Sequence, residues 1–435
     1  MTPEAVSPEP ATGRLGVLIV GLGAIATSLI AGVLAVRRGK GRPVGSLAMM
    51  GRVSRPDGEK DVPISTAVPL AVLDDLVFGA WDIVAEDGLA AARAARVLDE
   101  DLLQALASDL QAIRPWPGIH DPRYLRNIEA NNARPRQTAR AAAEQIREDI
   151  HAFRRSSGAA RLVLLNCAST EAWFPLDETH SNLKAFEAAL DKGTDAISPS
   201  MIYAWAALKE RVPVVNCTPN RCADIPALLD LANELAVPVA GRDLKTGQTL
   251  MKTILAPGLK ARALGLAGWY STNILGNRDG AVLDDPASLK AKQESKLSVL
   301  EGILRPDLYP DLYGKIEHQV HIDYYPPRRD NKEAWDNIDI FGWLDYPMQI
   351  KINFLCRDSI LAAPLALDLS LFVDLAQRTG LRGAQEWLSV YFKSPTTRSG
   401  KSVHDLFEQR RAFDEALVTL AGWTAPGRTR AGRIS

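Results

Sequence analysis

Cysteine and histidine are scarce in this chain, and neither is spaced as a metal ligand. The 435 residues hold six histidines and four cysteines, Cys167, Cys217, Cys222 and Cys356. No CxxC, HxH or HExxH pattern occurs, so the sequence predicts neither a zinc site nor a disulfide framework. We therefore expect no bound metal, and a protein of the reducing cytoplasm.

The chain also has no large excess of positive or negative charge. Lysine and arginine number 51 against 52 for aspartate and glutamate, and no long run of either sign stands out. A nucleic-acid-binding protein needs a basic face, so nucleic acid is not an expected partner. With 46% hydrophobic residues, the composition is that of a globular protein, and the length predicts two or three domains.

One apolar segment is long enough to suggest a membrane anchor. No charge occurs from Leu15 to Val36, and a basic cluster at 37–40 follows, as beside a transmembrane helix or a signal sequence. The segment also contains four glycines and begins with a strand-like run at 15–20. A buried strand, a glycine turn and a buried helix have the same hydropathy, so we favour a soluble protein that contacts no membrane. The anchor is the alternative.

Short apolar runs alternate with helical periodicity through the first part of the chain. The runs predict strands at 15–20, 44–50, 161–166, 212–216 and 236–240, and the periodicity predicts helices at 24–37, 137–155, 182–191 and 225–235. Strands that alternate with helices predict an α/β fold with a parallel sheet covered on both faces. Three prolines and no apolar periodicity predict a mobile arm at 1–14.

The composition changes after about residue 250. Asn, Asp, Tyr, Trp and Pro are frequent in 265–360, with alternating patterns at 316–325 and 348–356. These features indicate a second, mixed α+β unit. Helical periodicity returns from about 358 to 392, and the polar end at 424–435 is expected to fray.

The first candidate site is a glycine turn between a predicted strand and a predicted helix. The pattern G-x-G-x-x-A is formed by Gly21, Gly23 and Ala26, with Ala24 and Ile25 between them. In a dinucleotide-binding turn the first glycine permits the sharp turn, the second lets the backbone approach a pyrophosphate, and the small third residue lets helix and strand pack closely. Because a predicted strand precedes the turn and a predicted helix follows it, we favour dinucleotide binding over a glycine turn that serves only packing.

The acid expected to bind the ribose is missing from its usual place. It would close the next strand, which we predict at 44–50, yet that run contains no Asp or Glu. Asp82, in the segment FGAWDI, is an alternative ribose partner. A solvated turn acid fits the same residue equally well.

The second candidate site lies on a helix predicted at 284–304. At 100° per residue this helix has an apolar sector formed by Leu289, Leu297, Val299, Leu300, Ile303 and Leu304. Lys292 and Lys296 fall inside the sector, four residues apart, where a surface lysine is unexpected. Snorkelling is the structural alternative, but the pair favours a pocket in which lysines carry protons or bind oxyanions.

Other polar residues are candidates for the same pocket. They are Asn273, Asn277, Asp279, Asp243, Lys332, Asp358 and Lys393. Turn formation explains the first three equally well, and each of the others taken singly is more typical of a surface charge. An acid beside the lysines is needed to balance their charge and to relay protons.

Several ordered sequence blocks resemble the myo-inositol-1-phosphate synthase family, also called inositol-3-phosphate synthase. The resemblance runs from about residue 15 to 395. Its most specific blocks are GRDLKTGQT (241–249), STNILGNRDG (271–280), KQESKLSV (292–299), DNK (330–332), CRDSILAAP (356–364) and FKSP at Lys393. So many blocks in order are far more specific than the glycine turn alone.

The resemblance implies a fold and a reaction. The fold is a Rossmann-type NAD-binding domain built from 15–250 and 362–435, with a catalytic and tetramerising α+β domain inserted at 251–361. In the family, bound NAD+ oxidises carbon 5 of glucose 6-phosphate, carbon 6 attacks the carbon 1 aldehyde as an enolate, and the ring ketone is then reduced. The expected enzyme is a homotetrameric isomerase with a sugar phosphate substrate and no net redox change.

The resemblance also implies roles for the lysines. Lys292 would relay the proton at the oxidised carbon, Lys332 and Lys393 would stabilise developing oxyanions, and Lys296 would bind the substrate phosphate. Two carboxylates would orient and balance these lysines, and other positions would hold the cofactor or the substrate. The carboxylates are Asp243 and Asp358; the cofactor set is Gly21, Gly23, Ala24, Ile25, Ala26, Asp82, Asn220 and Asp279; the substrate set is Asn273, Asn277, Asp330 and Lys296.

The chain departs from the family at three blocks. Cys217 replaces Gly in NG[SA]PxN, Arg329 replaces Gly in GD[SN]K, and Asn166 stands where many members carry Trp. A side chain in place of glycine removes space and restricts φ, while Arg329 offers a second grip on phosphate. These changes leave open a paralogue that closes fructose 6-phosphate to a five-membered cyclitol phosphate in secondary metabolism. An NAD dehydrogenase with net redox change and an inactive NAD-binding regulator are the remaining alternatives.

Overall fold

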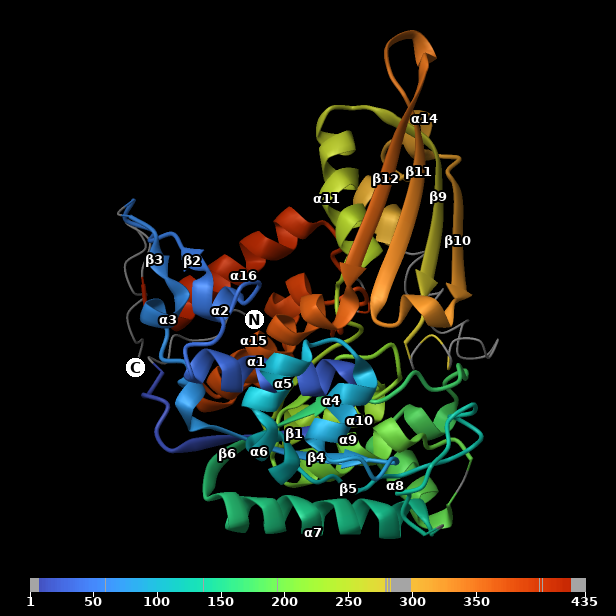
Figure 1. Cartoon of the computed structure of the whole chain (residues 1–435). Coiled ribbons are helices and arrows are strands. Elements are labelled where there is room, and N and C mark those ends of the chain that lie inside the picture. The colour runs from blue at the N-terminus through green and yellow to red at the C-terminus, as the bar shows by residue number, and fades with distance from the viewer. Residues whose placement is uncertain are drawn as a thin grey trace.

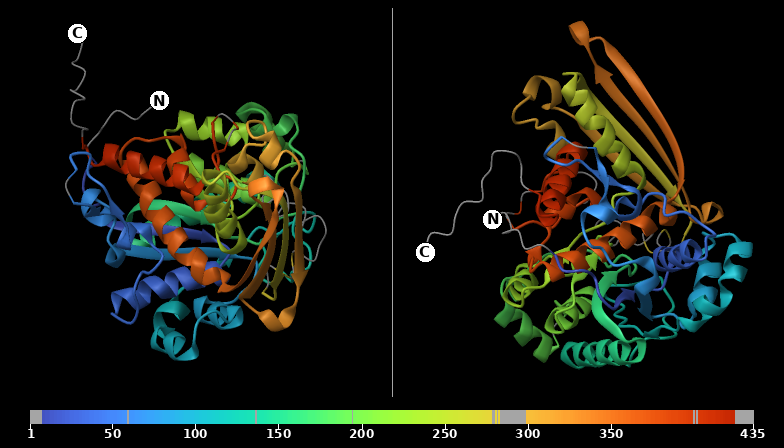
Figure 2. Two further views of the ribbon diagram at one scale, coloured as in Figure 1. Left: turned by 90° about the horizontal axis from the view of Figure 1, so that it is seen from above. Right: turned by 90° about the vertical axis from the view of Figure 1, so that its left-hand side faces the viewer.

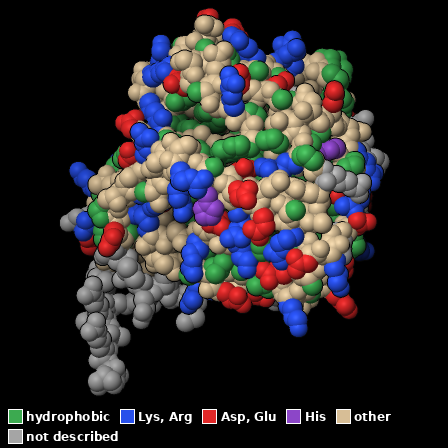
Figure 3. Space-filling view, turned by 90° about the horizontal axis from the view of Figure 1, so that it is seen from below, with side chains coloured by type: hydrophobic (Ala, Val, Ile, Leu, Met, Phe, Trp, Pro, Cys, Tyr) green, Lys and Arg blue, Asp and Glu red, His purple; other side chains and the backbone are tan. Residues whose placement is uncertain are grey.

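Two sheets organise the computed structural model (Figures 1 and 2). The structure describes residues 8–58, 60–135, 137–193, 195–277, 280, 282, 299–398, 400 and 402–423. On the face shown in Figure 3, the coloured basic and acidic side chains are interspersed and form no patch of one sign.

The larger sheet has seven parallel strands in the order β13-β8-β7-β6-β1-β4-β5. The strands are β1 (Arg14–Val20), β4 (Leu76–Asp82), β5 (Trp116–Pro117), β6 (Ala159–Asn166), β7 (Val214–Asn216), β8 (Pro238–Ala240) and β13 (Gly383–Ala384). Chain order runs one way from β1 to β5 and the other way from β6 to β8, so the direction reverses between β1 and β6. This topological switch point confirms the predicted α/β fold of Rossmann type.

Helices cover both faces of this sheet (Figures 1 and 2). One face packs against α1 (Ala24–Arg37) and α15 (Asp358–Arg378), and the other against α7 (Ala139–Ser157), α8 (Leu183–Lys192), α9 (Pro199–Lys209) and α10 (Pro226–Glu234). Because both faces are buried, the strands are continuous apolar runs. The helices predicted at 24–37, 137–155, 182–191 and 225–235 are confirmed as α1, α7, α8 and α10.

Further elements surround the larger sheet and its helices. They are α2 (Leu47–Met50), β2 (Arg52–Val53), β3 (Val62–Pro63), α3 (Ile64–Ala67), α4 (Gly88–Ala95), α5 (Glu100–Ala105), α6 (Ala107–Ala112) and α16 (Leu406–Leu420). Single 3-10 turns occur at η1 (Leu73–Asp75), η2 (Glu178–His180), η3 (Pro326–Arg328), η4 (Trp343–Asp345) and η5 (Glu386–Tyr391).

A second, four-stranded sheet stands at the top of Figure 1. Its order is β10-β9-β11-β12, with β9 (Gly265–Leu275) parallel to β10 (Glu317–Tyr324) and antiparallel to β11 (Asn331–Phe341), which pairs antiparallel with β12 (Pro347–Arg357). The helix α11 (Gly247–Ala261) packs against this sheet, and α14 (Pro310–Tyr313) against β9. The sheet confirms the predicted mixed unit. The predicted domain boundaries fall inside α11 and α15, so the domain limits stay a prediction.

The strand predicted at 44–50 is wrong. The helix α2 occupies the end of this run, and Asp368 of α15 accepts hydrogen bonds from the Ser46 hydroxyl and from the next two backbone amides. An apolar run of this length fits a strand or a buried helix, and the tertiary contact with the carboxylate stabilises the helix. The strand that follows α1 in the parallel sheet is β4, which ends at Asp82.

Two further expectations need correction. The helix predicted from 358 to 392 ends at Arg378, and β13 and η5 follow it. In the arm predicted at 1–14, the described part is attached to the body of the molecule: Arg378 donates to the Glu9 carbonyl at 2.6 Å, and Arg161 donates to the Thr12 carbonyl. Residues 1–7 and the end at 424–435 lie outside the described residues.

The apolar segment 15–36 forms β1 and α1, in the centre of the larger layer, so the membrane-anchor alternative is wrong. Among the described helices, only α15 is long and apolar enough to cross a membrane, and 72% of that stretch is buried inside the protein. Such burial is typical of a core helix.

The helix predicted at 284–304 is described only at its end. Residues 299–304 are helical, and the predicted apolar residues Val299, Leu300, Ile303 and Leu304 are buried in the core of the smaller sheet. Lys292 and Lys296 lie outside the described residues.

We expect the variant Asp368→Ala to lose about 3 kcal/mol of unfolding free energy, because it leaves buried donors at the start of α2 without an acceptor. Tyr391→Phe removes one donor to the same carboxylate, 3.0 Å away, and should cost only about 1 kcal/mol. Urea unfolding at constant pH measures both. Equal losses in the two variants would contradict the role given to Asp368.

Candidate active site

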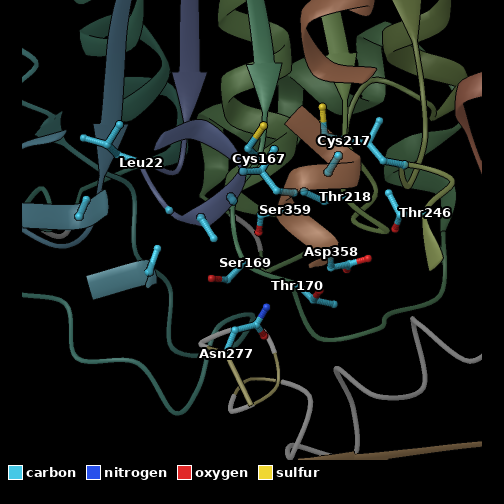
Figure 4. Close-up of a pocket in the computed structure, with 18 of the residues that line it drawn as sticks. Leu22, Cys167, Ser169, Thr170, Cys217, Thr218, Thr246, Asn277, Asp358 and Ser359 are labelled. Atoms are coloured by element: carbon cyan, nitrogen blue, oxygen red, sulfur yellow. The ribbon is translucent and has the colours of Figure 1, made fainter. Parts of the chain in front are cut away.

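A cavity of about 390 Å³ lies at the switch point of the larger sheet, next to the smaller sheet. The glycine turn and the ends of β6 and β7 contribute to its lining, together with Asp243, Asn277, Asp358 and Lys393. In Figure 4 the side chains of Ser169, Asn277 and Asp358 face one space below the strand ends. Ligands of open α/β sheets bind at this position.

The glycine turn has the geometry that its pattern predicts. Gly21 adopts a φ of +90°, and a Cβ atom there would lie 2.8 Å from the Cα atom of Ala168, so only glycine fits. At Gly23 no atom lies within 4 Å of an added Cβ, which leaves room for a ligand to approach the backbone. No side chain caps the N-terminus of α1, whose amides and dipole attract phosphate.

Asp82 ends the strand beside β1 and contacts the glycine turn. Its Oδ2 atom accepts from the Leu22 amide at 2.5 Å, and its Oδ1 atom accepts from the Val84 amide at 2.9 Å. Asp82 also lines a second cavity of about 100 Å³, which shares Gly23 and the start of the segment after β6 with the larger cavity. The alternative of a purely solvated turn acid therefore does not hold, although ribose binding stays a prediction.

Glu171 is a buried acid that sequence analysis did not single out. It lines the smaller cavity, and its Oε1 atom accepts from the amide and hydroxyl of Ser200 at 2.9 and 2.8 Å. Its Oε2 atom is buried without a described partner, and burial raises the pKa of Glu171 to about 7. The sequence feature that could have identified Glu171 is its position five residues after the predicted strand at 161–166.

Asn220 supports the loop that carries Glu171. Its side chain accepts from the Glu171 amide at 2.8 Å and donates to the Ser169 carbonyl at 3.0 Å. Like Ala26, which is fully buried in α1, Asn220 does not appear among the residues that line either described cavity. Asn220 thus holds the loop at 169–171, and direct contact of Ala26 or Asn220 with a cofactor stays a prediction.

Lys393 and Asp243 form a buried ion pair in the larger cavity. The Lys393 Nζ atom lies 2.8 Å from Asp243 Oδ1, and each side chain is 4% exposed. Two short segments hold them, because the Lys393 amide donates to the Asp243 carbonyl at 2.7 Å and Leu244 forms an antiparallel bridge with Phe392. Removing one partner would take away the nearest opposite charge from a buried group, which is strongly destabilising.

A second ion pair lies beside the first. Lys332 of β11 places its Nζ atom 3.2 Å from Oδ2 of Asp358, the first residue of α15. Asp330 accepts from the Ser359 hydroxyl at 2.8 Å and from the Asn277 side chain at 3.4 Å. Burial raises the pKa of Asp330 above its ordinary value, against these hydrogen bonds. The predicted charged residues of 330–358 thus meet next to the cavity.

Not every predicted residue reaches the cavity. Asn273 is fully buried in β9, where its side-chain amide donates to Gln248, and it is absent from the lining. Asp279, like Lys292 and Lys296, lies outside the described residues. Ser359 and Arg329 do line the cavity; the departure from the family's glycine already pointed to Arg329.

Comparison with known proteins shows the family. The family model described as myo-inositol-1-phosphate synthase, a model for NAD-binding proteins, matches residues 15–417. The chain belongs to the myo-inositol-1-phosphate synthase family. It is 50% identical to an inositol-3-phosphate synthase of Bacteroides thetaiotaomicron, over 96% of this chain and 98% of that protein. It is 33% identical to the human inositol-3-phosphate synthase, over 94% of this chain and 78% of that protein.

Solved structures agree with this membership. The inositol-3-phosphate synthase of Caenorhabditis elegans is similar with a TM-score of 0.88 and 25% identity, covering 96% of this chain and 87% of that one. A synthase-related protein of Thermotoga maritima, at 22% identity and a TM-score of 0.71, shares the fold over 94% of this chain and 98% of that one.

As a member of the myo-inositol-1-phosphate synthase family, the chain uses NAD as its cofactor. The described residues fit this dinucleotide, because the glycine turn contributes Gly23 to the lining of both cavities and no atom lies within 4 Å of an added Cβ there. The backbone of the turn and the first amides of α1 would hold the pyrophosphate.

We expect Gly23→Ala to weaken NAD+ binding at least about tenfold, because the added methyl group occupies the space of the phosphates. Gly32→Ala is the matched control, since its added Cβ also has no atom within 4 Å but lies on an exposed part of α1. Calorimetric titration of the nucleotide-free protein measures both. Equal NAD+ affinities in the two variants would show that the turn does not contact the cofactor.

Proposed function

We propose that this chain cyclises D-glucose 6-phosphate to myo-inositol 1-phosphate, also written 1D-myo-inositol 3-phosphate. The observation that carries the proposal is that one cavity is lined by the dinucleotide turn, by the buried Lys393–Asp243 pair and by Asp358, the partner of Lys332. The 50% identity to an inositol-3-phosphate synthase over nearly both full lengths supports it. The net reaction is an isomerisation.

The chemistry needs a recyclable hydride acceptor and stabilised oxyanions. NAD+, when bound, takes the hydride from carbon 5 and later returns it. The carbon 5 hydroxyl gives up its proton as the hydride leaves, and the resulting ketone acidifies carbon 6, which then loses a proton. The carbon 6 enolate forms the new bond to carbon 1, and the carbon 1 oxygen gains a proton. The carbon 5 oxygen regains a proton when the hydride returns. Each step creates or removes charge on oxygen, so fixed cations and proton carriers suffice and no protein nucleophile is required.

Lys393 and Lys332 would supply the fixed positive charge. Both are nearly buried, and a cation in such a place acts on a developing oxyanion with little screening by water. Asp243 and Asp358 would keep their partners charged and oriented. We propose Lys292 as the proton relay and Lys296 as the phosphate ligand, as the family resemblance implies.

We also propose a homo-oligomer, with the tetramer of the family as the expected form. The smaller sheet supports an interface, since exposed apolar side chains line it. These are Tyr270, Trp335, Met348 and Leu355, with Trp343 at the adjoining turn. We keep 15–250 with 362–435 as the NAD-binding domain and 251–361 as the catalytic and oligomerisation domain, and the cytoplasm as the location.

Product analysis by phosphorus and carbon NMR tests the function. With NAD+ and glucose 6-phosphate, we expect a six-membered inositol monophosphate and no accumulation of NADH. A separate tube with fructose 6-phosphate should give no product. A five-membered cyclitol phosphate from fructose 6-phosphate would instead establish the paralogue, for which the comparisons give no support. Stoichiometric NADH would indicate a dehydrogenase.

A pair of variants tests the role of Lys393. We expect Lys393→Met to lower kcat by more than about 100-fold and to cost about 3–5 kcal/mol of stability, because the buried Asp243 carboxylate loses the ammonium group 2.8 Å away. In the double variant with Asp243→Asn, stability should recover and activity should not. Thermal unfolding and product formation are the two readouts. Recovered activity in the double variant would show that Lys393 serves only as the counter-ion of Asp243.

A further inference from the structure

Two cysteines directly follow the ends of two neighbouring strands and line the larger cavity. β6 and β7 are parallel, with Asn166 opposite Asn216 as their last paired residues. Cys167 and Cys217 follow directly, and the Cys217 amide still donates to the Asn166 carbonyl at 3.0 Å. Neighbouring strands lie about 4.8 Å apart, inside the range of roughly 4.4–6.8 Å that a disulfide requires between Cα atoms.

Both thiols point to the same face of the sheet. Side chains alternate along a strand, and both cysteines pack with the apolar core on the side of α1 and α15, whereas Asn166 and Asn216 face α9. Figure 4 shows the two sulfur atoms on the same side of the strand ends. The interaction with the neighbouring Cys167 thiol, together with burial, raises the pKa of the Cys217 thiol.

Cys167 and Cys217 differ in their exposure to solvent. Both residues line the larger cavity, but Cys167 is half-buried and Cys217 is 4% exposed. A small oxidant that enters the cavity therefore meets Cys167 first, and Cys217 lies behind it as a resolving thiol.

We propose that Cys167 and Cys217 form a modification site, which a peroxide converts to a disulfide that weakens cofactor binding. The Cys167 sulfur attacks the peroxide O–O bond and becomes a sulfenic acid, with release of one water. The Cys217 sulfur then displaces the hydroxyl as a second water and forms the S–S bond. Two thiols and one hydrogen peroxide thus give one disulfide and two waters.

The disulfide would act on the cavity through the chain segments on either side. An S–S bond is about 2.0 Å long, shorter than any non-bonded sulfur contact, so the ends of β6 and β7 must shift or the side chains must rotate. The segment after Cys167 packs against Gly21, whose added Cβ would lie 2.9 Å from the Cys167 carbonyl. Movement at Cys167 is therefore transmitted to the glycine turn.

The test uses the full-length protein, treated with hydrogen peroxide with and without saturating NAD+. Free thiols are then alkylated as the protein is unfolded in denaturant, so that buried thiols are also blocked, and the trypsin digest is analysed by mass spectrometry. Each cysteine falls on its own tryptic peptide, at 162–184, 212–221, 222–242 and 352–357. We expect a link between 162–184 and 212–221, a mass loss of about 2 Da, and slower linkage with NAD+ bound.

Binding of NAD+ is measured on the same samples. The linked protein should bind NAD+ about tenfold more weakly, and dithiothreitol should restore the affinity. Cys222→Ser is the matched control: Cys222 is buried on the other face and donates to the Ser200 carbonyl at 3.4 Å, so its variant should still form the link. Cys217→Ser should form none.

Each contrary result overturns the proposal. The first would be that peptides 162–184 and 212–221 remain unlinked while Cys167 is oxidised alone. The second would be a link to Cys222 or Cys356 instead. The third would be that the linked protein binds NAD+ with unchanged affinity. Because these readouts are a peptide mass and a cofactor affinity, they stand apart from turnover of any sugar phosphate. Failure of the proposed reaction is thereby distinguished from failure of the thiol pair.

Discussion

The close contact between the glycine turn and the end of β6 is the constraint on which the site depends. Gly21 has a φ of +90°, and a side chain there would meet the backbone of Ala168 at 2.8 Å. The turn therefore lies directly against the strand end where the sheet reverses, and Gly23 faces open space. At this point the segments after β1 and β6 diverge to opposite sides, so the polar groups of the turn, of β6 and of β7 surround one cavity. A larger residue at 21 would separate them.

The charges of the cavity come from elsewhere in the chain, and burial makes them costly. Asp243 follows the larger sheet, Lys393 belongs to the C-terminal segment, and Lys332 comes from the smaller sheet. Desolvation of each charge opposes folding. The attraction within each ion pair offsets this free-energy cost only if the paired groups stay at hydrogen-bonding distance. Backbone hydrogen bonds between the segments 243–245 and 391–393 keep Asp243 and Lys393 at this distance. Charges that are already in place need no reorganisation when an oxyanion develops, so the structural cost is consistent with a catalytic use.

Local features could be predicted from the sequence, and long-range ones could not. The turn at Gly21 and the bounds of α1 depend on neighbouring residues, and both match the structure. The run at 44–50 was misassigned because a carboxylate 320 positions away caps its helix, and this error hid the place of Asp82 at the end of the adjacent strand. Lys393 and Asp243 were recognisable as candidates, but their pairing across 150 positions requires the fold. Glu171 escaped notice because its pKa is set by burial, which a lone sequence position does not reveal.

The two glycine replacements act on different parts of the same cavity. Arg329 keeps a positive φ of 54°, the conformation for which glycine is favoured, and adds a guanidinium group at the lining. Cys217 adds a thiol beneath the ends of the strands. Neither replacement breaks the Lys393–Asp243 pair or the Lys332–Asp358 pair. In the proposed mechanism the charged pairs stabilise the chemical steps, and the other lining residues select ligands. We therefore expect these two replacements to alter substrate affinity and sensitivity to oxidants more than the reaction itself.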